Sequence, residues 1–210
     1  MSAIVRKLPL PLAVAAVVAL ITLTGGARSA SADQLSYNLT ISNGGISPTA
    51  PSYGTVTLTL NGTGGIDVSA AMTPGYQLGG GFGFNVVGST TGLSITNPSA
   101  GWTPGTGLHL DGFGNFEYGV TSNPSNRYNT LSFTVTRAVG FTTVTQLVDL
   151  STGGSLSAAF ATHVFPTSST GSTGYAGTTT SPIPEPATMT MLGLGLVGIG
   201  GWLRRRSKTG

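Results

Sequence analysis

Cysteine is absent from this 210-residue chain, and charged residues make up only 7% of it. Without cysteine, the chain can form neither a disulfide nor a thiolate metal site. A body of this size can fold around a hydrophobic core without such cross-links. The length allows one domain of ordinary size together with additional segments.

Basic residues are nearly missing from the middle of the chain. The formal net charge is +3, but seven of the nine Lys and Arg residues lie within residues 1–32 or 183–210. Between them, only Arg127 and Arg137 are basic, against five acidic residues. A nucleic-acid interface needs basic side chains clustered on the folded domain, so we expect no nucleic-acid partner.

Familiar catalytic signatures are also missing. Neither the hydrolase pattern G-x-S-x-G nor the zinc pattern H-E-x-x-H occurs in the chain. The two histidines, His109 and His163, lie 54 positions apart, which is a sparse basis for a zinc site. We therefore expect a protein that is not an enzyme and that carries no cofactor and no metal.

Short alternating stretches dominate the middle of the chain, which is rich in glycine. Residues 55–60, for example, read TVTLTL and place Val56, Leu58 and Leu60 on one face. Clusters of Gly, Pro, Asn and Ser separate such stretches. We predict an all-β fold, an antiparallel β-sandwich of about eight to nine short strands. The predicted strands cover residues 35–41, 55–60, 82–87, 92–95, 107–110, 115–120, 130–139, 143–150 and 156–165, with a short helix as the alternative for the last.

The N-terminus has the three parts of a secretory signal peptide. A basic pair, Arg6 and Lys7, precedes an apolar run over residues 12–23. Ala30 and Ala32 then form a small-x-small cleavage site. The alternative is an uncleaved anchor, but the apolar run is short for a membrane span. We predict export, with a mature chain that begins near Asp33.

The C-terminus carries a second apolar run. Residues 187–203 contain no charge, and at 1.5 Å per residue they would form a helix of roughly 25 Å. Trp202 lies where an aromatic residue prefers the membrane interface, and Arg204, Arg205 and Arg206 follow as a cytoplasmic stop. A buried core helix is the alternative, but the five glycines of the run disfavour it. We predict a transmembrane helix.

The order of features at this end resembles a known sorting signal. Pro184-Glu185-Pro186, one apolar span and an arginine cluster together resemble the PEP-CTERM sorting signal of Gram-negative bacteria. The resemblance implies processing by exosortase, a membrane-embedded enzyme, and an association with exopolysaccharide and biofilm matrix. It implies a body tethered to the inner membrane on the periplasmic side, then placed at the cell surface or outside the cell. The two prolines keep the motif extended, as a protease substrate requires.

These observations predict four segments and a non-enzymatic surface or extracellular-matrix protein. The alternative is a carbohydrate-binding module that acts on matrix polysaccharide. The segments are a signal peptide at 1–32, a β-sandwich body at 33–165, a Gly/Ser/Thr-rich spacer at 166–182 and the sorting signal at 183–207.

Within the body, the densest polar cluster lies between residues 109 and 118. Asp111, Asn115 and Glu117 offer oxygen ligands for a hard cation such as calcium, although the spacing does not match an EF-hand loop. A glycine-kinked turn with a solvated rim is the simpler interpretation.

Several aromatic residues lie close to this cluster in sequence. If exposed, Trp102 and its neighbours Phe113, Phe116 and Tyr118 could stack on sugar rings. If buried, they belong to the hydrophobic core, and we expect the core.

Overall fold

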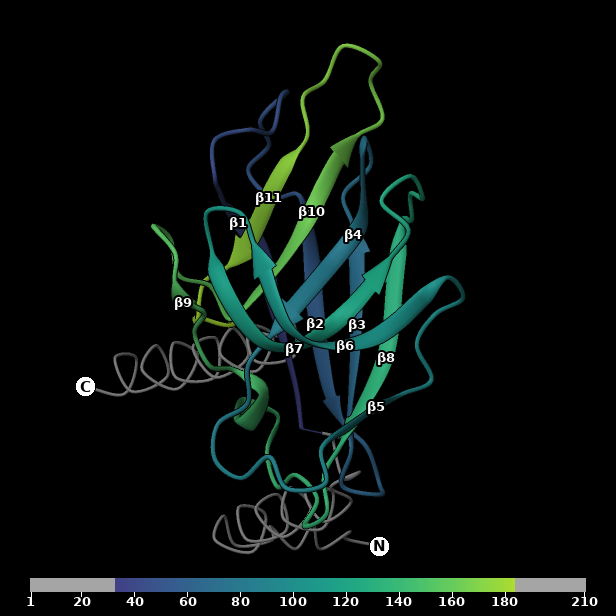
Figure 1. The fold of residues 1–210 in the computed structure, drawn as a ribbon, viewed down its shortest axis with the longest axis vertical. Coiled ribbons are helices and arrows are strands. Elements are labelled where there is room, and N and C mark those ends of the chain that lie inside the picture. Colours follow the sequence, from purple (N-terminus) through teal and green to yellow (C-terminus); the bar gives the residue numbers. More distant parts are fainter. Residues whose placement is uncertain (1–32, 184–210) are drawn as a thin grey trace, which may run out of the picture. The chain divides into compact units, whose positions relative to one another are not determined.

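The computed structural model describes residues 33–183, which fold as an all-β body (Figure 1). The predicted all-β class is confirmed. Eleven strands and one 3₁₀ helix lie within this range. They are β1 (Gln34–Ser42), β2 (Gly54–Leu60), β3 (Ile66–Met72), β4 (Tyr76–Phe84), β5 (Ser94–Thr96), β6 (Trp102–Leu110), β7 (Gly114–Ser122), β8 (Thr130–Thr136), η1 (Val144–Leu147), β9 (Thr152–Gly153), β10 (Phe160–Pro166) and β11 (Gly174–Thr178).

The strands form one continuous antiparallel sheet rather than the expected two separate sheets. Their order is β5-β8-β3-β2-β1-β11-β10-β4-β7-β6, and β9 pairs with β7. β1 belongs to both halves, because residues 34–38 pair with β2 and residues 39–42 pair with β11. The register shifts between Leu39 and Ile41, and such an irregularity bends a strand. The sheet therefore turns at β1.

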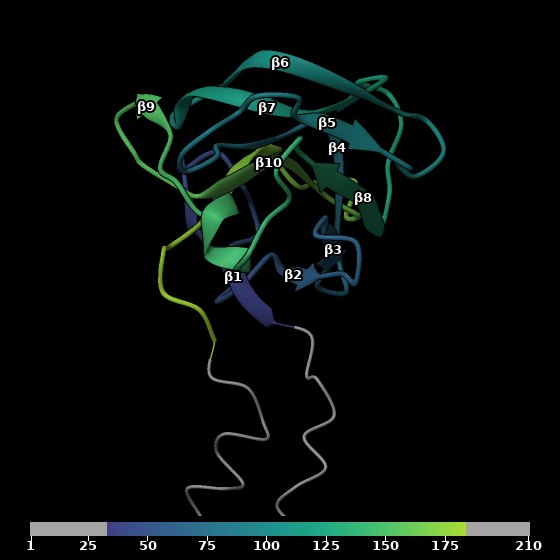
Figure 2. The ribbon, with the colours of Figure 1, turned by 90° about the horizontal axis from the view of Figure 1, so that it is seen from below.

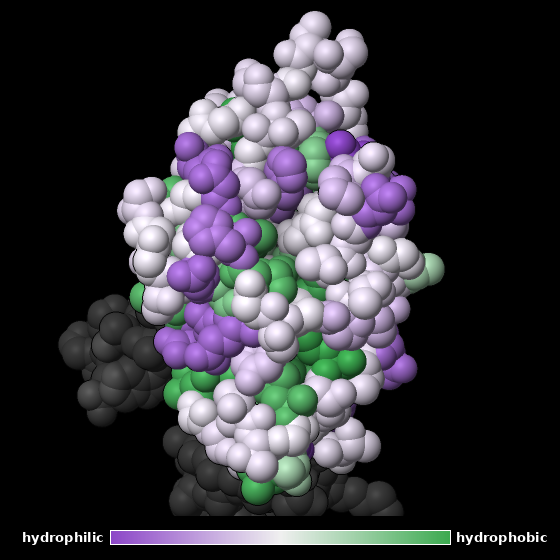
Figure 3. Space-filling view, in the orientation of Figure 1, coloured by the Kyte–Doolittle hydropathy of each residue, from purple (hydrophilic) through white to green (hydrophobic). Residues whose placement is uncertain are grey.

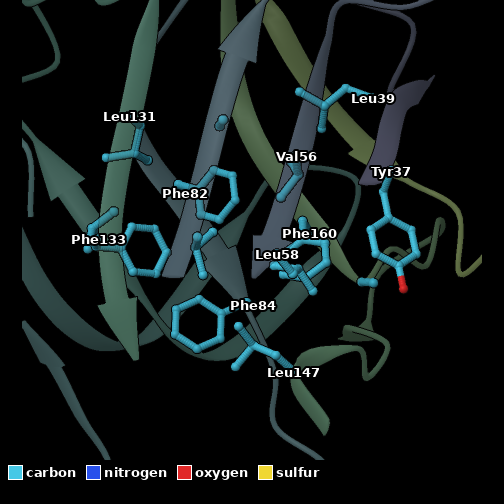
Figure 4. Close-up of a cluster of buried hydrophobic side chains, with 14 of the residues drawn as sticks. Tyr37, Leu39, Val56, Leu58, Phe82, Phe84, Leu131, Phe133, Leu147 and Phe160 are labelled. Carbon is cyan, nitrogen blue, oxygen red and sulfur yellow. The ribbon is translucent and has the colours of Figure 1, made fainter. Parts of the chain in front are cut away.

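The two halves of the sheet pack face to face around aromatic side chains (Figure 4). The ring centroids of Phe82 in β4 and Phe133 in β8 are 5.8 Å apart, and those of Tyr37 in β1 and Phe160 in β10 are 5.9 Å apart. Each of these side chains is at most 2% exposed. Because alternate residues of a strand point to opposite faces, the apolar positions of each strand gather in this core.

A second, smaller core lies under the hairpin of β6 and β7. Leu108, Leu110 and Phe116 of the hairpin cluster with Ala161 of β10. A Cβ on Gly83 of β4 would lie 2.6 Å from the Phe116 ring, so glycine is needed there for the hairpin to approach. Figure 2 shows β6 and β7 lying over β4 and β10. The hairpin therefore adds a partial third layer.

Several strand predictions are wrong in detail. Residues 143–150 contain η1 rather than a strand, because the Gln146 side chain accepts hydrogen bonds from the backbone N–H groups of Thr142 and Thr143. The prediction misses β3, whose inward residues include the small Ala70. It also starts β4 and β6 too late, since their first residues are rich in Gly and Pro. The strand predicted over residues 156–165 is confirmed for residues 160–165, and it begins later than predicted because β10 starts at Phe160.

β11 corrects the expected spacer at residues 166–182. It lies between β1 and β10 in the middle of the sheet and is mostly buried. Its small residues suit that position, because a Cβ on Gly177 would lie 2.6 Å from Ala158 and from the Phe113 ring. The low apolar content that suggests a linker instead reflects a crowded interior.

Candidate functional site

Trp102 is part of the core. It is 5% exposed and packs on Tyr128 with ring centroids 5.3 Å apart. Phe113 and Phe116 are also buried, and Tyr118 is half-buried. The core interpretation is therefore confirmed for Trp102, Phe113 and Phe116. The sugar-stacking alternative for Trp102 is wrong, because a ligand cannot reach the face of its ring.

Asp111, Asn115 and Glu117 lie around the turn of the β6–β7 hairpin, and all three are exposed. Asn115 and Glu117 share the outward face of β7, whereas Asp111 precedes the strand. The Nδ2 of Asn43 donates to the backbone carbonyl of Asp111 at 3.3 Å. Nowhere in residues 33–183 do three His, Asp or Glu side chains gather closely enough to hold a metal ion. The hard-cation site stays a prediction.

A polar pocket of about 460 Å³ opens beside Asp111. The end of β1, the hairpin turn and the segment before β10 meet there. Asn43 links the end of β1 to the hairpin turn through Asp111 and also to β11, because its Oδ1 accepts a hydrogen bond from the Tyr175 backbone N–H at 3.1 Å. The lining offers the hydroxyl groups of Ser42 and Ser155, the amide of Asn43 and the carboxylate of Asp111, and Gly44, Gly112 and Leu156 complete it.

A row of stacked side chains that could not be predicted from the sequence lies on the outer face of β10 and β11. We call it the aromatic row (Arg127, Phe165, His163 and Tyr175). The Cζ of Arg127 lies 3.3 Å from the centroid of the Phe165 ring. The His163 ring centroid lies 4.0 Å from that of Phe165 and 4.5 Å from that of Tyr175. His163 and Phe165 are two positions apart on β10, and this spacing is the one feature of the sequence that would place two members of the row on the same face of a strand. Tyr175 lies on β11, which the sequence did not predict.

The surroundings of His163 and Tyr175 in the aromatic row favour the neutral forms of these two side chains. Burial lowers the pKa of His163, and the Arg127 guanidinium lowers it further. Burial raises the pKa of Tyr175, and the carboxylate of Asp111 adds to this shift. His163 shares a hydrogen bond of 3.1 Å between its Nε2 and the Thr173 hydroxyl. The row therefore presents a neutral, partly covered surface with a cation at one end.

The described chain ends beside its own first strand. Ile183 forms an antiparallel bridge with Ser36 of β1, and its N–H donates to the Ser36 carbonyl at 2.7 Å. At Ile183 the chain therefore runs toward the Asp33 end of β1. Asp33 is fixed as well, because its carbonyl accepts from the Leu60 N–H at 2.8 Å and its Oδ2 from the Val144 N–H at 2.9 Å. Both ends of the body meet at the start of β1.

Two loops surround this meeting point. The Gly64 carbonyl, in the turn of residues 61–65, accepts a hydrogen bond of 2.7 Å from Phe141 in the loop of residues 137–141. We call the end formed by Asp33, these two loops and η1 the β1 pole. In Figure 1 it lies at the bottom, and the β10–β11 loop lies at the top.

The remaining sequence predictions concern residues outside the described range. They are the cleavage site at Ala30 and Ala32, the motif Pro184-Glu185-Pro186, and the arginines Arg204, Arg205 and Arg206 with the apolar run before them. Within residues 33–183, no helix has the length and apolar character that a membrane crossing would need.

The junction at Ile183 coincides with a recognised signal. A family described as the PEP-CTERM protein-sorting motif matches residues 182–206. No curated protein and no solved structure shows a significant match to the chain. The motif defines the class: an exported protein with a C-terminal membrane anchor, which exosortase sorts to the cell surface. The chain is a PEP-CTERM sorting domain-containing protein.

Proposed function

We propose that the protein is a non-enzymatic component of the cell surface or extracellular matrix. Its body stays on the periplasmic side of the inner membrane while the C-terminal anchor holds it. Processing at the sorting motif then releases it to the surface, in contact with exopolysaccharide and biofilm matrix. The N-terminal leader pattern and the arginine stop after the apolar run support this orientation.

The main support for a matrix role comes from the outer face of the β5-β8-β3-β2-β1 half of the sheet. We call this surface the hydroxyl face. Short polar side chains occupy it in rows across the paired strands. Ser36, Thr57, Ser69 and Ser132 form one row, and Thr59, Asp67, Thr134 and Thr96 form another.

Neighbouring groups on this face pair with one another. The hydroxyls of Ser36 and Thr57 are 3.0 Å apart, and the Thr134 hydroxyl donates to Asp67 Oδ1 at 2.8 Å. Asp67 is the charged member of these rows, and Asn61 Nδ2 also donates to its Oδ1 at 3.1 Å. A hydroxyl-covered surface of low charge can exchange hydrogen bonds with water and with sugar hydroxyls, as a component of a hydrated polysaccharide matrix must.

One observation favours carbohydrate binding as a second candidate function. A pocket of about 360 Å³ opens in the hydroxyl face and is lined by Thr59, Asp67, Val68, Ser69, Asn97, Ser132, Phe133 and Thr134. Its hydroxyl, amide and carboxylate groups are those that bind sugar hydroxyls. This site replaces the one that the sequence suggested at Trp102.

Deletion of residues 184–210 tests the sorting part of the proposal. The full chain should yield a surface form whose intact mass lacks the C-terminal span, recovered together with matrix material. The deleted chain should be exported but should not reach the surface fraction. A surface form that retains the C-terminal span would contradict release by processing. Cleavage of the polysaccharide by the purified body would contradict the non-enzymatic role.

Titration of the body with the producing organism's own exopolysaccharide tests the second candidate. Saturable binding should be lost when Ser69→Tyr fills the pocket. The matched control is Thr121→Tyr on the outward face of β7, which should bind like the wild type. Equal loss in both variants, or no binding by the wild type, would remove carbohydrate binding at this pocket.

A further inference from the structure

We propose that the β1 pole is a membrane-contacting face. While the C-terminal anchor is in place, the pole lies in the lipid headgroup layer, and the Val139 side chain contacts lipid. The inference deepens the proposed function and rests on the anchored stage that precedes processing.

The length of chain between the body and the anchor sets this position. The charge-free run begins at Ala187, four residues after Ile183, and four extended residues span at most about 14 Å. Ile183 lies beside Ser36, and three strand residues, about 10 Å, separate Ser36 from Asp33. At Ile183 the chain points toward Asp33, and four residues that continue in this direction would reach only about 4 Å beyond the pole. The headgroup region is about 5–7 Å thick on each side, so a tether of this reach holds the pole within it.

The side chains at the pole suit this environment. Val139 is 79% exposed and Val87 is 46% exposed, and both lie in connections at this end of the body. The backbone N–H of Val87 donates to the Gln146 carbonyl of η1 at 2.9 Å, and η1 in turn contacts Asp33. Val87 and Val139 are two of the three exposed large hydrophobic residues in the described part of the chain.

The loop that carries Val139 is held in shape. The Nε of Arg137 donates to the Gly140 carbonyl at 2.7 Å, and its Nη1 donates to the Ser89 carbonyl at 3.1 Å. The guanidinium also lies 4.3 Å from the centroid of the Phe141 ring. The positive charge of Arg137 at the pole is opposed by Asp33 and by Asp67, whose Oδ1 accepts from Asn61 in the turn of residues 61–65. Apolar contact and the short tether, rather than an excess of positive charge, therefore bring the pole to the lipid.

The absence of cysteine makes a site-specific test direct. Val139→Cys and Ser169→Cys each give a single labelling site, the first at the pole and the second in the β10–β11 loop at the opposite end. The full chain, with leader removal checked by intact mass, is labelled with a fluorophore. It is then reconstituted into vesicles of neutral phospholipid that contain a headgroup-quenching lipid. We expect loss of emission from the label at position 139 and none at position 169.

A flexible insert of about 20 Gly and Ser residues between Ile183 and Pro184 serves as the second variant. Such an insert adds a reach of tens of ångströms and should remove the quenching at position 139 while the chain still floats with the vesicles. Equal quenching at both labels, quenching at neither, or quenching that survives the insert would overturn the proposal. A chain that does not float would overturn the anchor itself and the proposal with it.

Discussion

At the scale of single residues, His163 gives the body a pH dependence. Burial and Arg127 hold its pKa in the folded state below the ordinary value of 6.5. As the pH falls through 6.5, the unfolded chain takes up a proton before the folded chain does, so the free energy of unfolding decreases. The stabilising contribution is therefore complete above pH 6.5 and is lost below it.

Urea unfolding between pH 5 and 8 measures this effect. His163→Gln should flatten the loss of stability on the acidic side of the range. His109→Gln, at an exposed position on β6, is the matched control and should keep the wild-type profile. A His163→Gln profile that still falls like that of the wild type would show that another group is responsible.

Gly83 is a residue-scale test of the second core. A Cβ at this position would lie 2.6 Å from the Phe116 ring, so Gly83→Ala must displace the β6–β7 hairpin. We expect a loss of about 1–3 kcal/mol in the free energy of unfolding, as is typical of overpacking. Gly62→Ala is the control, because a Cβ there meets nothing within 4 Å. Similar denaturation midpoints for the two variants would mean that the hairpin adapts without cost.

At the scale of elements, β11 decides where the body ends. A chain that stops at residue 165, the boundary predicted from the sequence, lacks the strand between β1 and β10. Both neighbours would then expose unpaired edges, which favour aggregation. We expect residues 33–183 to give a monodisperse β protein by circular dichroism and gel filtration, and residues 33–165 to aggregate. A soluble, folded 33–165 fragment would contradict the central role of β11.

The sequence predicted elements where the alternation is strong. Val56 and Leu58 in β2, and Leu131 and Phe133 in β8, have the period of two that one buried face produces. β11 could not be recognised in the same way, because the crowded interior there accepts only small residues such as Gly177.

Whether a functional region could be predicted from the sequence depends on how close together its residues lie in the chain. The sorting motif could be predicted from the sequence because its features are adjacent in the chain. The aromatic row and the hydroxyl face could not, because strand pairing brings their residues together across long separations, as it does for Ser69 and Ser132.

At the scale of the whole molecule, the sorting motif begins where the body ends. The hydrogen bond from the Ile183 N–H to the Ser36 carbonyl holds the residue next to Pro184 against β1. A processing enzyme that binds the following residues as an extended strand must work close to this contact. Proline has no N–H, so Ile183→Pro removes the hydrogen bond.

We expect Ile183→Pro to accelerate removal of the tail, measured by pulse-chase as the ratio of precursor to processed protein. Ile183→Val keeps the N–H and should match the wild type. Unchanged or slower processing of Ile183→Pro, with a body that still folds, would show that the contact does not limit access.

The meeting of the two ends at β1 also makes the body a candidate for circular permutation. Because Ile183 lies beside Ser36, a linker of a few residues is enough to join Ile183 to Asp33. New chain ends could be opened in the exposed turn at Asn123–Asn126, between β7 and β8 and away from the β1 pole. The anchor would then follow the end of the body opposite to the β1 pole. The permuted protein would then stand inverted on the membrane, with the β10–β11 loop facing the lipid and Val139 facing outward.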